Sequence, residues 1–141
     1  MNVRILLAVD LFHHENAHKA LTEAVAMARW KGADLHVCYV LAYGHYSYVQ
    51  PFIPPEVLAD SKKRATDDLN ALIAGWDDSG VRIVPHILQG GISEQVLKLA
   101  TEISAVHVVV NGRADAPSAR ATGPNTAQIA RLAPCAVTIL P

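Results

Sequence analysis

The sequence has little net charge, few cysteines and no long apolar run. Its 141 residues include 12 lysines and arginines against 13 aspartates and glutamates, and the formal net charge is −1. Nucleic-acid-binding domains normally carry a basic surface, so we expect no nucleic-acid partner. No apolar stretch approaches the roughly 20 residues of a membrane-spanning helix, so we expect no membrane partner either.

Cysteine is almost absent, and this bears on the cellular compartment. The two cysteines, Cys38 and Cys135, each lie in an apolar run, which is typical of buried free thiols rather than of a disulfide framework. The first apolar run, 5–9, is shorter than the core of a signal peptide, which has about 7–15 residues. These features predict a cytoplasmic protein.

Apolar residues are plentiful in spite of these absences. They make up 51% of the sequence, and charged residues make up 18%. This balance favours a packed core over disorder, and the length suits a single domain that spans residues 1–141.

Apolar runs alternate with amphipathic stretches along the whole chain. The runs predict strands at 3–9, 35–41, 81–88, 106–111 and 136–140. The amphipathic stretches predict helices at 15–32, from Pro54 until the pattern fades at 77–80, at 92–104 and at 124–132. Pro85 cannot donate a ladder hydrogen bond, so the third strand is expected near a sheet edge. The aromatic- and proline-rich segment 42–55 is expected to be a loop.

Strands that alternate with helices in this way form a parallel sheet that is covered by helices on both faces. We therefore expect an open, five-stranded, Rossmann-like α/β domain. Ligands of such sheets bind beyond the carboxyl ends of the strands, where the strand order reverses. In this sequence those ends are Val9-Asp10, Val40-Leu41 and Asn111-Gly112.

The stretch between the fourth strand and the last helix is the most informative one. The apolar run 106–110 stops at Asn111-Gly112-Arg113, a polar loop follows, and Gly123-Pro124-Asn125-Thr126 opens a helix. The backbone N–H groups of such a loop and helix start point toward an anion, and glycine allows a close approach. The stretch therefore predicts a phosphate-binding site.

Four segments carry a resemblance to a known family. They are 5–10 (ILLAVD), 31–37 (KGADLHV), 104–113 (SAVHVVVNGR) and 123–139 (GPNTAQIARLAPCAVTI). In this order and spacing they resemble the universal stress protein family over essentially the whole chain. The resemblance implies an adenine nucleotide alpha hydrolase-like fold with strand order 3-2-1-4-5. It also implies a stress-response switch that binds ATP with Mg²⁺.

The resemblance, carried over position by position, implies which residues hold the nucleotide. Adenine and ribose are expected near Ala8, Val9, Asp10 and Val40. The phosphates are expected on Asn111, Gly112, Arg113, Gly123, Pro124, Asn125 and Thr126.

The loop departs from the family signature G-x2-G-x9-G-[S/T]. Gly112 matches its first glycine, but Asp115 stands at the second, the spacing to Gly123 is shorter, and Pro124 replaces the hydroxyl residue. The loop looks closer to a branch of the family with a shortened, glycine-poor loop, which is also regarded as ATP-binding.

Two other functions stay open at this point. If the altered loop has lost the nucleotide, the protein acts through protein contacts alone, and the 42–55 loop is then a candidate partner surface. His14-Glu15-Asn16-Ala17-His18 matches the H-E-x-x-H pattern of zinc hydrolases, but no third ligand follows at an expected spacing. We assign no metal ligand and no catalytic residue. At most weak ATP hydrolysis or autophosphorylation is expected, because no general base is placed to activate water.

Some single residues carry smaller expectations. His36 and His107 lie in strand runs and are expected to be satisfied core or edge residues, and Ser93 is expected to supply a hydroxyl at a helix start. The last strand, 136–140, is apolar and would leave an unpaired sheet edge, so a homodimer through this strand is expected.

Overall fold

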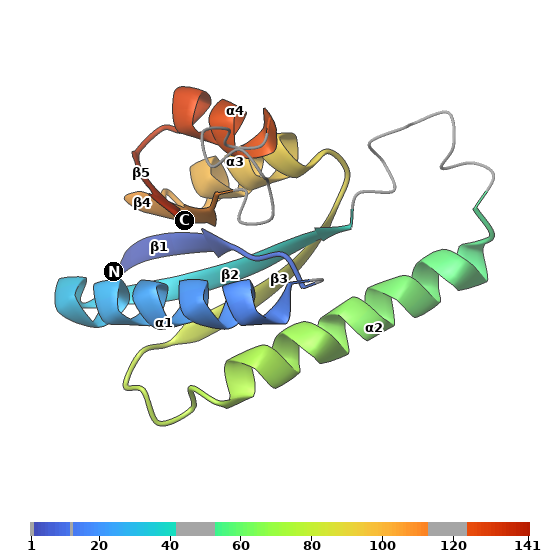
Figure 1. Cartoon of the computed structure of the whole chain (residues 1–141), viewed down its shortest axis with the longest axis horizontal. Helices are drawn as coiled ribbons and strands as arrows, with labels where there is room; N and C mark the ends of the chain where they lie inside the picture. The colour runs from blue at the N-terminus through green and yellow to red at the C-terminus, as the bar shows by residue number, and fades with distance from the viewer. Residues whose placement is uncertain (1, 12, 42–52, 113–123) are drawn as a thin grey trace.

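The computed structural model describes residues 2–11, 13–41, 53–112 and 124–141 (Figure 1). Strands and helices alternate along these residues as the hydrophobic pattern predicts. The strands are β1 (Val3–Ala8), β2 (Ala33–Leu41), β3 (Ile83–Gln89), β4 (His107–Asn111) and β5 (Ala136–Leu140). The helices are α1 (His14–Lys31), α2 (Pro55–Ala74), α3 (Ile92–Glu102) and α4 (Pro124–Leu132).

The strands form one parallel sheet in the order β3-β2-β1-β4-β5, which confirms the expected fold class and strand order. Helices α1 and α2 cover one face of this sheet, and α3 and α4 cover the other (Figure 1). The chain runs outward from β1 through β2 to β3, then crosses to β4 and continues outward to β5. The strand order therefore reverses between β1 and β4, which is where such sheets bind ligands.

An apolar layer lies on each face of the sheet, and β1 contributes to both. Ile5 and Leu7 belong to the cluster under α1 and α2, whereas Leu6 belongs to the cluster under α3 and α4. All three side chains are fully buried. A strand buried on both faces needs an apolar residue at every position, which explains the unbroken run in the sequence.

Strand β3 lies at one edge of the sheet, as Pro85 predicted. Its side chains are mostly half-buried, and Pro85 itself is exposed. The missing N–H of proline costs nothing at such a position, because no further strand lies beside it to accept a hydrogen bond in the described part of the chain.

Several predicted boundaries are wrong by one to three residues, for identifiable reasons. Helix α1 ends at Lys31, because Gly32 adopts a left-handed conformation (φ 63°) and its N–H caps the last turn. Helix α3 ends at Glu102 rather than at 104, because Ser104 also takes a positive φ of 54°. Strand β2 begins at Ala33 rather than at 35, since Asp34 already pairs with Arg4 of β1 in the ladder. Helix α2 ends at Ala74, three residues before the predicted 77–80, with Gly75 as its C-cap. The other shifts are of the size at which helix and strand ends fray.

The buried polar residues follow the expectations only in part. Cys38 is buried and Cys135 is half-buried, and both are free thiols. His107 has a partner, with its Nε2 2.6 Å from Thr138 Oγ1. His36 was also expected to be satisfied, but its buried Nε2 has no hydrogen-bond partner within the described part of the chain.

No helix among the described residues combines the length and the apolar character that a membrane crossing requires.

Candidate functional site

The carboxyl end of β1 lies between the corresponding ends of β2 and β4. Ala8 is level with Cys38 on one side and with Val110 on the other. The Val9 N–H still donates to the Cys38 carbonyl (3.0 Å), so β1 remains against β2 for one residue beyond its assigned end. By this register, Val9 and Asp10 reach the level of the residues that end β4.

The predicted adenine and ribose residues therefore share one edge of the sheet. Val9 and Val40 are buried apolar side chains, Ala8 is half-buried, and Asp10 is exposed. This arrangement places a polar carboxylate next to an apolar floor. A purine ring with an attached ribose has the same combination of an apolar face and a polar hydroxylated part.

Asp10 is oriented by the turn that leads into α1. Its Oδ2 lies 2.9 Å from His13 Nδ1, and the His13 backbone N–H donates to the Asp10 carbonyl at 3.3 Å. Both side chains are about half exposed, so this contact adds little to stability. Its effect is to hold the carboxylate at the mouth of the sheet.

Gly112 follows β4 directly, and its lack of a side chain has a reason within the fold. Its N–H donates to the Leu140 carbonyl at the end of β5. A Cβ at this position would lie 3.1 Å from the Leu140 carbonyl oxygen and 3.5 Å from Ile139 Cγ2. The glycine that the sequence assigned to a ligand is therefore also needed for the close approach of β5.

The first turn of α4 is attached to the end of β4 by a side chain. Thr126 Oγ1 donates a hydrogen bond to the Asn111 carbonyl at 3.1 Å. The helix begins with Pro124, and the N–H groups of Asn125 and Thr126 belong to the first turn, where no intrahelical acceptor exists. These N–H groups and the positive end of the helix dipole lie beside the β4 end, as an anion site requires.

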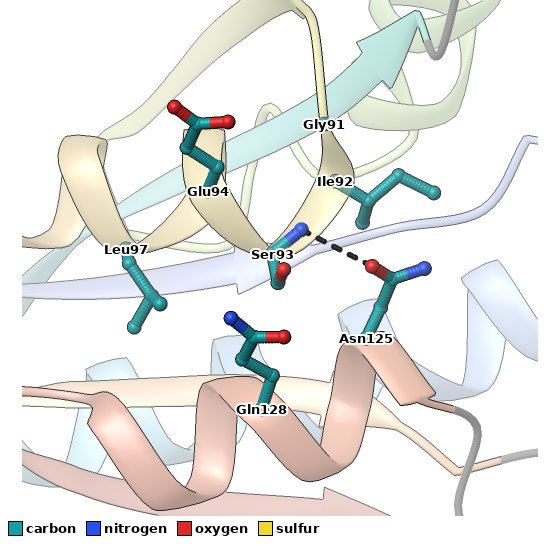
Figure 2. Close-up of a pocket in the computed structure, with 7 residues that line it drawn as sticks. All are labelled: Gly91, Ile92, Ser93, Glu94, Leu97, Asn125 and Gln128. Carbon is teal, nitrogen blue, oxygen red and sulfur yellow. Dashed lines mark hydrogen bonds between the residues drawn. The ribbon is translucent and has the colours of Figure 1, made fainter. Parts of the chain in front are cut away.

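Asn125 also links α4 to α3. Its Oδ1 accepts a hydrogen bond from the Ser93 backbone N–H at 3.4 Å (Figure 2). Gly91, the N-cap residue of α3, has no side chain to cap the helix, so Asn125 supplies part of the cap from a distant element. Ser93 lies in the first turn of α3, as expected, but the N-cap residue is Gly91 and no side-chain hydroxyl caps the helix there. No sequence signal pairs Asn125 with Ser93, because 32 positions separate them.

A cleft of about 360 Å³ lies between the first turns of α3 and α4 (Figure 2). It is lined by Gly91, Ile92, Ser93, Glu94, Leu97, Asn125 and Gln128. Of the predicted nucleotide-binding residues that the structure describes, only Asn125 lines it. Glu94 also lines this cleft, and its negative charge disfavours a phosphate group there. The cleft is therefore a neighbour of the predicted site rather than the phosphate subsite itself.

Several predicted features lie outside the described residues. These are Arg113, Gly123, the departure at Asp115 and all but the end of the aromatic loop 42–55. The site that the structure brings together consists of the ends of β1, β2 and β4 and the first turn of α4.

The H-E-x-x-H motif lies at the start of α1, with His14, Glu15 and His18 all exposed. Within the described ranges, no group of three or more histidine, cysteine, aspartate or glutamate side chains is arranged to hold a metal ion. A zinc site built on these histidines thus has no third protein ligand in this part of the chain.

Known proteins with similar structures share this architecture. The universal stress protein UspA from Lactobacillus plantarum is 23% identical, with a TM-score of 0.81 over 99% of this chain and 98% of the relative. A universal stress protein from Archaeoglobus fulgidus in complex with dAMP is 18% identical, with a TM-score of 0.70 over 99% of this chain and 98% of the relative. A universal stress protein in complex with cAMP is also 18% identical, with a TM-score of 0.70 over 99% of this chain and 96% of the relative.

The sequence profile that describes the universal stress protein family matches residues 1–141, which is the whole chain. The resemblance of the four sequence segments, the strand order and this match agree, and the protein belongs to the universal stress protein family.

Proposed function

We propose that this protein binds ATP with Mg²⁺ at the carboxyl edge of the sheet and acts as a stress-response switch rather than as an efficient hydrolase. The observation that carries the proposal is the position of the α4 first turn. Thr126 ties that turn to the end of β4, at the point where the strand order reverses. A helix N-terminus at a switch point is the usual phosphate subsite of an open α/β sheet.

In the proposed complex, the base and ribose lie over β1 and β2. The buried side chains of Val9 and Val40 supply an apolar floor, with Ala8 beside them. Asp10 is exposed at the rim, and its carboxylate accepts hydrogen bonds from ribose hydroxyls. The complexes of relatives with dAMP and cAMP support an adenine nucleotide as the ligand.

The phosphates lie at the end of β4 and on the first turn of α4 in this proposal. The residues are Asn111, Gly112, Arg113, Gly123, Pro124, Asn125 and Thr126. The N–H groups of the first turn of α4, which have no acceptor within the helix, supply donors, and Arg113 supplies positive charge. Mg²⁺ would be held chiefly by the phosphates and water, as is usual for this ion. We also propose that the chain belongs to the branch with a shortened phosphate loop, and that it works in the cytoplasm.

Calorimetric titration of the nucleotide-stripped protein with ATP and Mg²⁺ tests the proposal. We expect binding in the micromolar range, and Asp10→Ala is expected to weaken it about 10–100-fold, the range for losing hydrogen bonds to a charged group. Asp60→Ala is a matched control, because Asp60 is an exposed aspartate on α2 that contacts Arg64 (3.3 Å). This variant should bind as the parent does.

The absence of binding heat for ATP, ADP and AMP in a folded parent would overturn the proposal. It would favour the alternative in which the protein acts through protein contacts alone. Equal loss of affinity in the Asp10 and Asp60 variants would show that the effect does not come from the proposed ribose contact.

We further propose a homodimer through β5. This strand lies at the sheet edge, and its Ile139 side chain is 39% exposed although it is aliphatic. An apolar edge strand without a neighbour is a liability that a second copy can remove by pairing.

Ile139→Lys is expected to convert the dimer to a monomer, because it places a charge in the proposed interface. Val57→Lys is the control, since Val57 is an aliphatic residue that is 48% exposed on α2, and this helix packs on β3 and β2, whereas β5 is at the opposite edge of the sheet. Sedimentation velocity measures both. An Ile139→Lys variant with the parent's sedimentation mass would contradict the interface.

A further inference from the structure

An unusual pair of histidines joins β2 to the edge strand β3. His36 Nδ1 lies 2.7 Å from His86 Nε2, and the ring centroids are 5.0 Å apart with 20° between their planes, so the two rings are nearly coplanar and meet edge to edge. His36 is buried, with 8% of its surface exposed, and its Nε2 has no hydrogen-bond partner among the residues that the structure describes. The nucleotide proposal does not use this pair, which lies on the sheet face covered by α3 and α4.

The number of protons on the pair follows from this geometry. Two neutral imidazoles carry two ring protons, and one of them must lie between His36 Nδ1 and His86 Nε2. If His36 Nδ1 is the donor, His36 Nε2 is a buried acceptor and the second proton is on His86 Nδ1. The reverse assignment would bury an unpaired N–H at His36 Nε2, which is the more costly of the two. We therefore assign the Nδ1–H form to His36.

A third proton has no satisfactory position while the pair is closed. The space between the rings holds one proton, so the other two must be on the outer nitrogens. His36 Nε2 would then be a buried N–H donor of a charged ring without an acceptor. Protonation of the closed pair is costly for this reason, whichever ring carries the formal charge.

The charged and titratable groups around the pair do not remove this cost. They are Arg4 on β1, Asp34 and Cys38 on β2, Arg82 before β3, and Glu102 on α3. Burial lowers the pKa of His36, with His86, Arg4 and Arg82 acting in the same direction against Asp34. Burial also lowers the pKa of His86, against the attraction of Glu102. Burial raises the pKa of the Cys38 thiol to about 12, so this thiol stays neutral.

The Asp34 carboxylate is already engaged by other groups. It accepts hydrogen bonds from Asn2 Nδ2 at 2.9 Å and from an Arg82 guanidinium nitrogen at 3.2 Å. The Asn2 hydrogen bond and the Arg82 charge lower the pKa of Asp34 despite its burial. The Asp34 carboxylate is therefore ionised, and each of its two oxygens already accepts a hydrogen bond. Neither oxygen is hydrogen-bonded to His36 Nε2.

We propose that the His36–His86 pair is a proton-operated latch that holds β3 against β2 at neutral pH and releases it in acid. Opening exposes both imidazoles to water, where each takes up a proton at its ordinary pKa. Because the pKa values of the closed form are lowered, the latch is strongest above about pH 6.5 and weakens as the pH falls below it. Such a response would let the protein detect acidification directly.

Release of β3 would alter the cleft between the first turns of α3 and α4 and the proposed nucleotide site beside it. Helix α2 packs on β3, and the Gly90 N–H after β3 donates to the Leu41 carbonyl at the end of β2 (3.0 Å). Gly91 and the start of α3 follow immediately, where Asn125 caps the Ser93 N–H. A movement of β3 is thus transmitted to the first turns of α3 and α4.

Hydrogen–deuterium exchange at about pH 7.5 and pH 5.5, corrected for the intrinsic rates, tests the latch. Protection of β3 amides is expected to fall about tenfold or more at the lower pH, while β1 and β4 change less. His86→Gln keeps a neutral acceptor for His36 Nδ1–H and leaves His36 as the one imidazole that takes up a proton on opening. Its β3 protection should therefore fall by a clearly smaller factor on acidification than the parent's. His18→Gln changes an exposed histidine on α1 and should behave as the parent does.

Two results would overturn the latch. One is the same pH-dependent loss of β3 protection in His86→Gln as in the parent. The other is a nitrogen NMR spectrum of the parent at about pH 7.5 in which His36 carries its proton on Nε2 rather than on Nδ1. The spectrum requires no variant, so it decides the matter even if the His86→Gln protein does not fold.

Discussion

Replacing Leu6 with alanine is expected to lower the free energy of unfolding by about 2–5 kcal/mol. Leu6 lies at the centre of β1, is 0% exposed and contributes to the cluster under α3 and α4. Its neighbours in the ladder are His36 and Val108, which β2 and β4 hold in place on either side. The cavity would therefore stay largely open. Chemical denaturation with a two-state analysis measures the loss.

Leu132→Ala is the matched control for this prediction. Leu132 ends α4 and is 54% exposed, so its truncation is expected to change stability by no more than about 0.5 kcal/mol. A loss of the same size in both variants would mean that the apolar layer under α3 and α4 is not the packed core described above.

Gly112→Ala is expected to destabilise the protein by about 1–3 kcal/mol in the absence of any nucleotide. The new methyl group would meet the Leu140 carbonyl oxygen at 3.1 Å, and backbone cannot move aside as a flexible side chain does. The expected strain lies where β4 and β5 end together. Thermal unfolding of the nucleotide-stripped protein measures it, and Gly112→Val should show a larger effect.

Gly75→Ala is the control for the glycine substitution. Gly75 follows α2, has an ordinary helical φ of −65°, and has no atom within 4 Å of a new Cβ. Alanine there should be neutral or stabilising by up to about 1 kcal/mol. If Gly112→Ala keeps full stability and loses only ATP binding, the glycine is needed for the ligand and the packing explanation is wrong.

Gly112 is a poor position at which to test the proposed nucleotide site, because it also contacts β5. A variant at Gly112 would lose nucleotide affinity either through a blocked ligand or through a displaced β5. The exposed Asp10 is the better probe, because its side chain lies at the surface, where it contacts His13.

The amino-acid sequence alone predicts the order of elements and the fold class of this protein. Unbroken apolar runs such as 5–9 indicate strands buried on both faces, Gly32 marks the end of the first helix, and Pro85 indicates an edge strand. These signals are local, because each depends on the conformation or hydrophobic period of neighbouring residues. They can therefore be recognised without knowing which residues pair with them across the sheet.

Contacts between distant residues were decided by the tertiary structure. The cap from Asn125 to Ser93, the contact of Gly112 with Leu140, and the His36–His86 pair each join segments separated by more than 25 positions. Neither the composition nor the hydrophobic period of the sequence indicates which side chains will come into contact across two strands or two helices. Gly112 illustrates the difference, since its residue type is plain in the sequence but the oxygen that excludes a side chain there is contributed by β5.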